Sequence, residues 1–200
     1  MKAIEAELLR AGITPIAGVD EAGRGPCAGP LVISAVILKD PTVPELAAVR
    51  DSKEVSEAKR EELFDVISEI AECVSTIIVT PQDIDKRGVH AANLDGMRRA
   101  VHGLEVTPAY VLTDGYAIEG LAIPNLAVWK GDQVVTAVSA ASIIAKVTRD
   151  RIMRELDEVY PQYGFAKHKG YITAAHTKAL KEFGPCPEHR TSFANIAALL

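Results

Sequence analysis

The feature that most constrains the fold is the segment PLVISAVIL at 30–38, which is apolar throughout except for Ser34. Its β-branched residues favour a strand, and the lack of polar alternation predicts that this strand is buried on both faces. The segment IAGVD at 16–20 precedes it across a turn rich in glycine and proline and is also typical of a strand. The sequence therefore predicts a buried central strand with a second strand beside it.

Further strand and helix patterns follow along the chain, without internal repeats or a linker rich in glycine and serine. The helix at 56–72 is predicted from apolar residues at helical spacing and from Ser56, a typical N-cap. Together the patterns predict a mixed five-stranded sheet with helices packed on it, in an α/β or an α+β arrangement. The other expected strands are 73–80, 109–115 and 126–130, and the other expected helices are 2–11, 91–104, 136–159 and 171–182.

Composition limits the classes of protein to which the chain can belong. Its 200 residues are 48% hydrophobic and 24% charged, which suits one packed domain over 1–200. No apolar run reaches the roughly 18 residues of a membrane span, and the charged start MKAIEAELLR is unlike a signal peptide. Three scattered cysteines without a CxxC pair indicate reduced thiols. We therefore expect a cytoplasmic protein with no membrane partner.

The net charge of −5 argues against a protein that binds nucleic acid through bulk positive charge. It does not exclude an enzyme whose carboxylates hold metal ions beside a nucleic acid. The charge is also uneven, because residues 1–145 contain 13 Lys and Arg against 21 Asp and Glu, whereas residues 146–200 contain 9 against 6. This asymmetry is typical either of a basic binding face or of ordinary variation among solvated helices.

Four carboxylates lie at or just after the predicted strand ends. Asp20 and Glu21 close the first strand, Asp114 closes the fourth, and Asp132 follows the fifth. Carboxylates that converge at adjacent strand ends repel one another unless a divalent cation lies among them, and Mg²⁺ prefers oxygen ligands. Each acid alone is more typical of a turn or a cap, but the four together favour metal-dependent hydrolysis of a phosphodiester.

The neighbouring positions of Asp20 and Glu21 raise a geometric question. Adjacent residues in a regular strand point to opposite faces, so these two acids share a site only if the chain turns at once. The sequence that follows, AGRGP, contains Gly23 and Gly25, which permit backbone conformations that other residues rarely adopt. We therefore expect the chain to turn immediately after the two acids, with Arg24 held between the glycines.

Other polar residues offer contacts to a nucleic acid. The glycines around Arg24 let a backbone approach a ribose 2′-OH, although a tight turn with a surface arginine explains the same tripeptide. Lys53, in a polar turn, and Lys146, on the long helix, are candidates for neutralising phosphates. Tyr171 ends the basic string KHKGY and could stack on a base or sugar, or equally serve as a core anchor.

Taken together, these residues resemble bacterial ribonuclease HII. The similarity extends in order over nearly the whole chain, and the strings DEAGRGP and SAASIIAKVTRD are long and specific. The related ribonuclease HIII has a threonine at the position of Arg24 and an N-terminal extension, so the resemblance is to the HII type. The matching strings are GVDEAGRGPCAGPLV at 18–32, DSK at 51–53, TDG at 113–115, KGD at 130–132, SAASIIAKVTRD at 139–150, YPQYGFAKHKGY at 160–171, HTKAL at 176–180 and GPCPEHRTSF at 184–193.

The resemblance implies an α/β fold of the ribonuclease H type, with a five-stranded mixed sheet flanked by helices and a small C-terminal helical part at about 160–200. It implies that the four carboxylates are catalytic and bind Mn²⁺ or Mg²⁺, with two ions in the reactive complex. It further implies a motif that senses the 2′-OH of a ribonucleotide, and a tyrosine that packs on the junction sugar. The substrate-binding residues implied are Gly23, Arg24, Gly25, Lys53, Lys146 and Tyr171.

The function implied by the resemblance is a metal-dependent endoribonuclease. It would hydrolyse the RNA strand of RNA–DNA hybrids and cut duplex DNA 5′ of single embedded ribonucleotides, leaving 3′-OH and 5′-phosphate ends. We expect a monomer that removes ribonucleotides from DNA and carries no partner-binding tail after Phe193. The alternatives are another nuclease of the same fold, which would cut DNA lacking ribonucleotides, and a non-catalytic hybrid-binding module. The pattern leaves open whether His176 and His189 are polar core residues or assist near the metal site.

Overall fold

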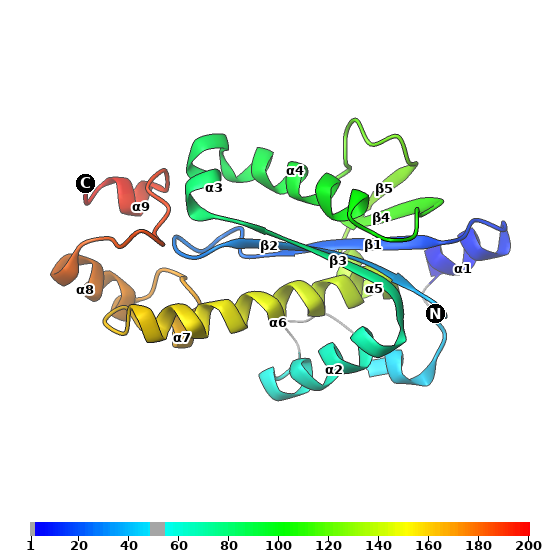
Figure 1. Ribbon diagram of the computed structural model, residues 1–200, viewed down its shortest axis with the longest axis horizontal. Helices are drawn as coiled ribbons and strands as arrows, with labels where there is room; N and C mark the ends of the chain where they lie inside the picture. Colours follow the sequence, from blue (N-terminus) through cyan, green and yellow to red (C-terminus); the bar gives the residue numbers. More distant parts are fainter. Residues whose placement is uncertain (1–2, 49–54) are drawn as a thin grey trace.

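The computed structural model describes residues 3–48 and 55–200, and its centre is a mixed sheet (Figure 1). The strands lie in the order β3-β2-β1-β4-β5, with antiparallel pairing from β3 to β1 and parallel pairing from β1 to β5. Every position of β2 is buried, as its apolar run predicts. The expected five-stranded mixed sheet is confirmed. The strands are β1 Ile16–Ala22, β2 Leu31–Leu38, β3 Ala71–Val79, β4 Tyr110–Asp114 and β5 Asn125–Val128.

Helices cover both faces of the sheet, as Figure 1 shows. The expected cap at Ser56 is confirmed, because its side chain accepts a 3.3 Å hydrogen bond from the amide of Lys59 at the start of α2. The long helix expected at 136–159 has those bounds. The helices are α1 Ala3–Arg10, η1 Pro44–Ala48, α2 Glu57–Ile70, α3 Pro81–Arg87, α4 Val89–His102, α5 Gly131–Val134, α6 Thr136–Val159, α7 Phe165–His168, α8 Ala174–Phe183 and α9 Ala194–Ala197.

Two apolar clusters hold the layers together. On one face, α4 packs on the sheet through residues such as Met97 and Ala100, which contact the cluster of Val19 and Ile33. On the other face, α6 packs against β1 and β2, and α2 packs against α6 and β3. Gly18 lets α6 approach β1 closely, because a Cβ atom at this position would lie 2.1 Å from the carbonyl carbon of Ala137. The helix that carries much of the later site is therefore held directly against the central strands.

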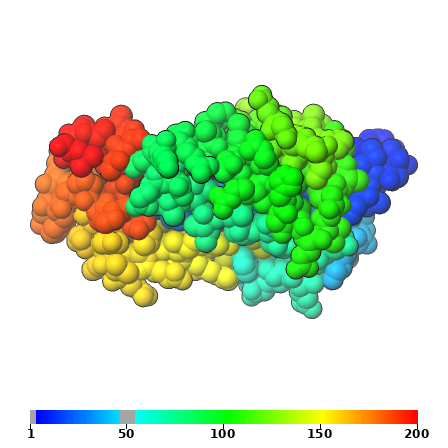
Figure 2. Space-filling model, turned by 45° about the horizontal axis from the view of Figure 1, so that its top comes forward, coloured from blue at the N-terminus to red at the C-terminus, as the bar shows by residue number. Residues whose placement is uncertain are grey.

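The C-terminal segment forms a smaller cluster at one end of the molecule. Figure 2 shows this segment, coloured orange to red, packed beside the yellow end of α6. Its buried residues Phe165 and Leu180 pack with Met153 of α6 and with Cys27 from the turn between β1 and β2. The turn that follows the first strand is therefore covered by the last quarter of the chain.

Several local expectations are corrected. The first strand does not end at Asp20 but continues through Ala22, because β2 supplies antiparallel partners up to the pair Ala22–Val32. The last expected helix begins at Ala174 rather than at 171, with Thr173 as its N-cap, and α9 follows it. Patterns of helical spacing missed α3, α5, α7 and α9, because such short helices depend on tertiary contacts rather than on periodicity.

Within residues 3–48 and 55–200, no helix combines the length and apolar character needed to cross a membrane.

Candidate metal centre

Asp20 and Asp114 come from adjacent parallel strands. Val19 of β1 is paired with Thr113 of β4, so the residues that follow them lie side by side at the carboxyl ends of the two strands. Side chains alternate along a strand, and Gly18, two positions before Asp20, faces α6. Asp20 therefore points to the α6 face, where Ser142 of that helix is its hydrogen-bond partner.

Asp132 reaches the same place from the short helix α5. The chain enters α5 through Lys130 in a left-handed conformation with φ 54°, and the amide of Gly131 donates a 2.7 Å hydrogen bond to Oδ1 of Asp114. A Cβ atom at Gly131 would lie 3.1 Å from the carbonyl oxygen of Thr113, so a side chain here would crowd the approach to β4. This contact holds Asp132, which is only 4% exposed, beside the strand ends.

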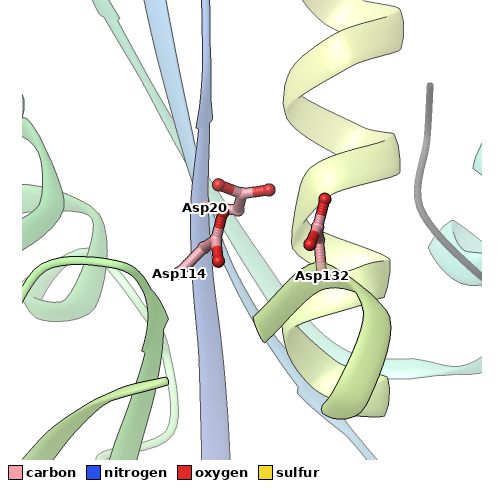
Figure 3. A group of neighbouring side chains, drawn as sticks. All are labelled: Asp20, Asp114 and Asp132. Atoms are coloured by element: carbon pink, nitrogen blue, oxygen red, sulfur yellow. The ribbon is translucent and has the colours of Figure 1, made fainter. Parts of the chain in front are cut away.

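Three carboxylates therefore gather between the end of β1 and α6 (Figure 3). Asp20, Asp114 and Asp132 each offer an oxygen atom, and these atoms lie within 4.8 Å of one another. Burial raises the pKa of Asp20 well above its usual range, and the negative charges of Glu21 and Asp114 raise it further. A cluster of buried like charges is costly unless a cation compensates it. The all-oxygen donor set fits a hard divalent cation such as Mg²⁺ or Mn²⁺.

Glu21 approaches from the other face of the sheet. Because β1 continues to Ala22, Glu21 points toward α4, where Asn93 lies beside it, and it is not one of the three carboxylates that share the close group. Burial raises its pKa, the charge of Arg24 lowers it, and the charge of Asp114 raises it. The expectation of an immediate turn that brings Asp20 and Glu21 to one face is therefore wrong. Within the described residues, Oε2 of Glu21 is buried without a hydrogen-bond partner, as an oxygen awaiting a cation would be.

Two buried arginines shape the turn that contains Gly23, Arg24 and Gly25. Arg190, from the C-terminal segment, donates to the carbonyl oxygens of Gly23, Arg24 and Gly29 at 2.7, 3.2 and 2.8 Å. Arg149 of α6 donates to the carbonyl oxygens of Ala28 and Pro30 at 3.1 and 2.9 Å. Burial, together with the charge of Arg149, lowers the pKa of Arg190 to about 9. The conformation of this turn is therefore set by side chains distant in sequence.

A pocket of about 370 Å³ lies between this turn and the carboxylates, and we call it the loop pocket. Gly25 faces the ring of Tyr171 across it, since a Cβ at Gly25 would lie 3.6 Å from that ring. Tyr171 is 52% exposed and precedes α8, so it is not the core anchor that the sequence left possible. The loop pocket is lined by Asp20, Glu21, Ala22, Gly23, Arg24, Gly25, Asp114, Ser142, Lys146, Arg149 and Tyr171.

Of the two lysines proposed to contact phosphates, the structure describes only Lys146. Lys146 lines the loop pocket, and its Nζ atom bonds both carboxylate oxygens of Asp150, one at 2.6 Å. Burial lowers the pKa of Lys146, whereas Asp150 raises it. Its charge is therefore already shared with a neighbouring carboxylate. Lys53, the other candidate, lies outside the described residues.

A second pocket, of about 400 Å³, also has Asp114 in its lining, and we call it the tryptophan pocket. It is lined by Trp129, Lys130, Gln133 and Tyr116, together with Asp114 and Asp132 and the backbone of Gly115. The guanidinium carbon of Arg24 lies 4.5 Å from the ring centre of Tyr116, so one side chain of the glycine turn reaches this second pocket. Sequence patterns did not single out Trp129 or Tyr116.

His176 and His189 are core residues that support the loop carrying Tyr171. The amide of Cys186 donates to Nδ1 of His189 at 2.9 Å, so Nε2 of His189 carries the proton and donates to Nε2 of His176 at 3.0 Å. Nδ1 of His176 in turn donates to the carbonyl oxygen of Tyr171 at 3.0 Å. This chain of neutral imidazoles links the segment before Arg190 to Tyr171.

Sequence reasoning missed the residues that act through the backbone. Arg149 follows Ser142 and Lys146 on one face of α6 at helical spacing, a signal that could have grouped the three. Arg190 carries no such signal, because its partners are carbonyl oxygens more than 160 positions away. A carbonyl group is present at every residue, so no residue type in the sequence marks it as a partner.

Comparison with known proteins identifies the relatives of this chain. A sequence model of the family Ribonuclease HII matches residues 17–196. The ribonuclease HII of Rhodococcus opacus (strain B4) is 52% identical over 200 residues, which cover 100% of this chain and 88% of the relative. That of Nocardia farcinica (strain IFM 10152) is 54% identical over 196 residues, which cover 98% of this chain and 78% of the relative.

Solved structures have the same fold. The crystal structure of ribonuclease H2 from Pyrococcus horikoshii OT3 superimposes with a TM-score of 0.80 at 30% sequence identity, covering 92% of this chain and 96% of that one. A ribonuclease HIII in complex with Mn²⁺ superimposes with a TM-score of 0.65 at 18% identity, covering 91% of this chain and 68% of that one. At that identity the likeness shows the fold alone. The expected ribonuclease H-like fold is therefore confirmed.

Proposed function

Because this chain belongs to the ribonuclease HII family, and is thus an endonuclease that hydrolyses RNA in RNA–DNA hybrids, we propose that it also cuts duplex DNA 5′ of single embedded ribonucleotides. The observation that carries the proposal is the position of the loop pocket. One pocket joins the buried carboxylates to a glycine turn and to an exposed tyrosine, so a phosphate and its neighbouring sugars can be held together. Its role would be the removal of ribonucleotides from DNA.

The carboxylates are the groups that would hold the metal. Asp20, Asp114 and Asp132 offer converging oxygens, and Glu21 adds a buried oxygen from the opposite face of β1. Bound divalent cations, Mn²⁺ or Mg²⁺, would supply activation of the attacking water and stabilisation of the leaving oxygen. We propose two ions in the reactive complex, because the donors lie on both faces of the strand. The hydrolysis forms a bond from the water oxygen to phosphorus and breaks the bond to the 3′ oxygen, leaving 3′-OH and 5′-phosphate ends.

The glycine turn would recognise the ribonucleotide through its backbone. A trans peptide points its carbonyl and its N–H in opposite directions. The carbonyl oxygens of Gly23 and Arg24 accept hydrogen bonds from the buried Arg190, so the N–H groups of Arg24 and Gly25 point away from that arginine. A ribose 2′-OH is absent from DNA and can accept such a bond, which makes these amides suitable for telling the two sugars apart.

Tyr171 and the basic residues complete the proposed substrate site. The half-exposed ring of Tyr171 faces Gly25 and would pack on the sugar at the junction. Lys146 would contact the nucleic-acid backbone by exchanging part of its interaction with Asp150 for a phosphate. We retain Lys53 as a second backbone contact on the basis of the family resemblance alone. We propose that the protein acts as a monomer in the cytoplasm.

The proposal is tested with a DNA duplex that carries one ribonucleotide. We expect the protein to cut it 5′ of the ribonucleotide when Mn²⁺ or Mg²⁺ is present, and to leave an all-DNA duplex of the same sequence intact. Asp20→Asn should abolish cutting, since it removes a carboxylate from the buried group. Tyr171→Ala should lower kcat/KM for the single ribonucleotide by roughly tenfold while folding is retained, because the ring is half exposed.

Three outcomes would contradict the proposal. Cutting that survives EDTA would exclude the role of divalent cations, and equal cutting of the all-DNA duplex would exclude recognition of the ribonucleotide. Cutting of a continuous RNA–DNA hybrid but not of the single-ribonucleotide duplex would restrict the enzyme to hybrids. A labelled 5′ end and a labelled 3′ end on the same strand identify the position of the cut and the chemistry of both new ends.

A further inference from the structure

The single tryptophan of the chain, Trp129, is 83% exposed and lies beside the carboxylate group. We propose that Trp129 and Lys130 form a binding subsite for the sugar and phosphate of the nucleotide on the 5′ side of the cut. The inference rests on the proposed function, because it takes the recognised ribonucleotide to lie in the loop pocket. It assigns the tryptophan pocket to the part of the cut strand upstream of the ribonucleotide, which is released with a 3′-OH end.

Trp129 does not pack in the fold as a core residue does. Tryptophan is a large apolar residue that is highly buried on average, and leaving an indole in water forgoes the stabilisation that burial would bring. The residue nevertheless follows β5 directly, in a segment that is firmly held. The amide of Gly115 donates to the carbonyl oxygen of Val128 at 3.1 Å, and the amide of Gly131 donates to Asp114. An exposed indole on a rigid backbone is suited to meeting a ligand.

The backbone around Trp129 ties it to the carboxylates. Lys130 adopts a left-handed conformation with φ 54°, which is uncommon for a residue other than glycine and turns the chain directly into α5. Asp132 follows in that helix, so the indole, the lysine and the carboxylate lie on one short segment. Strained conformations of this kind are found where the position of a side chain matters.

Asp114 lines both pockets, so the two meet at the carboxylate group. A strand whose scissile phosphate is held at the carboxylates can therefore extend from one pocket into the other. Arg24 joins the pockets, because it belongs to the glycine turn while its guanidinium group lies over Tyr116.

The polarity of the strand decides which nucleotide enters the tryptophan pocket. When the enzyme cuts 5′ of a ribonucleotide, that ribonucleotide carries the reacting phosphate on its own 5′ oxygen. With the ribonucleotide and its 3′ neighbour in the loop pocket, the next nucleotide beyond the phosphate is the one on the 5′ side. Its sugar offers an apolar face for the indole, and its phosphate offers a negative charge for Lys130.

Trp129 also supplies the test, because it is the only tryptophan and thus the only indole fluorophore. The complete duplex carries a central ribonucleotide with ten deoxynucleotides on its 5′ side. The truncated duplex keeps the ribonucleotide and the full complementary strand but lacks these ten deoxynucleotides. Ca²⁺ replaces the reactive metal so that binding can be measured. We expect the complete duplex to quench and shift the tryptophan emission and the truncated duplex to leave the emission unchanged, although fluorescence anisotropy of a labelled strand shows that both bind.

Substitutions separate this subsite from general binding. Trp129→Ala should raise the dissociation constant of the complete duplex by about tenfold and leave that of the truncated duplex unchanged, whereas Trp129→Phe should retain most of the affinity. Ile78→Ala is the matched control, since Ile78 is another exposed apolar residue and lies on β3, at the opposite edge of the sheet. It should bind both duplexes as the unmodified protein does.

The outcomes distinguish this inference from the proposed function. If the unmodified protein neither binds nor cuts the complete duplex in any metal, the proposed function fails. If the unmodified protein cuts that duplex, but Trp129→Ala weakens the binding of both duplexes equally, the subsite does not hold the 5′ nucleotide. The same conclusion follows if Trp129→Ala weakens the binding of neither duplex. Emission that changes equally with both duplexes would mean that the indole meets the complementary strand, and this too would overturn the assignment.

Discussion

Arg190 donates a 2.7 Å hydrogen bond from Nη2 to the carbonyl oxygen of Gly23, although the two residues are 167 positions apart in the chain. The guanidinium group is fully buried and also binds the carbonyl oxygens of Arg24 and Gly29. The C-terminal segment therefore shapes the turn that directly follows the carboxylates of β1. We therefore expect a substitution of Arg190 to disturb this turn while leaving the metal centre nearly unchanged.

Arg190→Lys should damage the turn more than the carboxylates. A lysine ammonium keeps the charge but lacks the planar fork that serves several carbonyl groups at once, and carbonyls left unsatisfied cost about 1–3 kcal/mol each. We expect a loss of about 2–4 kcal/mol in the free energy of unfolding, measured with urea, and at least a tenfold loss of kcat/KM on the single-ribonucleotide duplex.

The Mn²⁺ dissociation constant of Arg190→Lys, measured by calorimetry, should change by less than about twofold, because the carboxylates come from β1, β4 and α5. Arg154→Lys is the matched control, since Arg154 lies on the surface of α6 and pairs with Glu57 and Glu61. It should change the free energy of unfolding by less than about 0.5 kcal/mol. Equal damage by both substitutions would contradict a specific role for Arg190.

Asp20→Asn should weaken metal binding and yet stabilise the metal-free protein. Removal of an outer partner of a metal ligand costs about 10- to 100-fold in affinity, so loss of a carboxylate from the group itself should cost more than that. Without metal, the buried charge of Asp20 is destabilised by burial and by its acidic neighbours, as the raised pKa indicates. We expect Asp20→Asn to raise the free energy of unfolding in EDTA by about 1 kcal/mol.

Calorimetry with Mn²⁺ and urea unfolding in EDTA measure the two effects of Asp20→Asn on the same preparation. Asp95→Asn is the control, because Asp95 lies on the surface of α4 in ion pairs with arginines of its own helix and of α3. It should leave Mn²⁺ affinity unchanged. An Asp20→Asn protein that binds Mn²⁺ as tightly as the unmodified chain would show that the metal lies elsewhere.

The histidine pair predicts a loss of stability in mild acid. Burial, followed by the charge of His176, lowers the pKa of His189 to about 4, whereas the unfolded chain has a value near 6.5. Between these values the unfolded state binds more protons, so stability falls as the pH is lowered from 6.5 toward 4 and is not lost further below that. We expect about 1–2 kcal/mol to be lost between pH 6.5 and pH 5 from this group.

Urea unfolding at several pH values measures this effect, and His189→Phe should reduce the slope between pH 6.5 and pH 5. Part of the slope should remain, because burial also lowers the pKa of His176. His102→Phe is a suitable comparison, because His102 lies at the exposed end of α4 and should keep the slope of the unmodified protein. A slope in His189→Phe that equals that of the unmodified protein would assign the acid sensitivity to other groups. In the unmodified protein, the same protonation should loosen the link from His176 to the carbonyl of Tyr171.

Gly18→Ala should destabilise the protein, because it disrupts the close packing of α6 on β1. The new Cβ atom would lie 2.1 Å from the carbonyl carbon of Ala137, and a helix backbone cannot move aside without disturbing the packed layer. We expect a loss of about 3 kcal/mol or more in the free energy of unfolding. Gly25→Ala is the matched control for stability, because its nearest contact would be the ring of Tyr171 at 3.6 Å, and it should change stability by less than about 1 kcal/mol. Similar losses in the two variants would contradict the close approach of α6.

Sequence patterns predicted the strands that carry the site more accurately than the positions of its individual side chains. The strands themselves were predicted because alternation, β-branched residues and turns are local properties. Asp114 ends β4 as predicted, whereas β1 extends two residues past Asp20. The position of Glu21 was wrong, because the length of β1 is decided by pairing with β2 and not by the glycines that follow. Lys146 and Tyr171 were found as residues, but the pocket that joins them was not.

The sequence by itself determined the buried strand at the centre of the sheet, the long helix, and the presence of four acids in or near the strands of the site. Hydrophobic periodicity and residue type are sufficient for these features, since both act over a few neighbouring positions. Only the tertiary structure decided which carboxylates converge, that Glu21 faces α4, and that Arg149 and Arg190 hold the glycine turn. These relationships join atoms far apart in the chain, several of them backbone carbonyls that every residue possesses, so no local pattern can specify them.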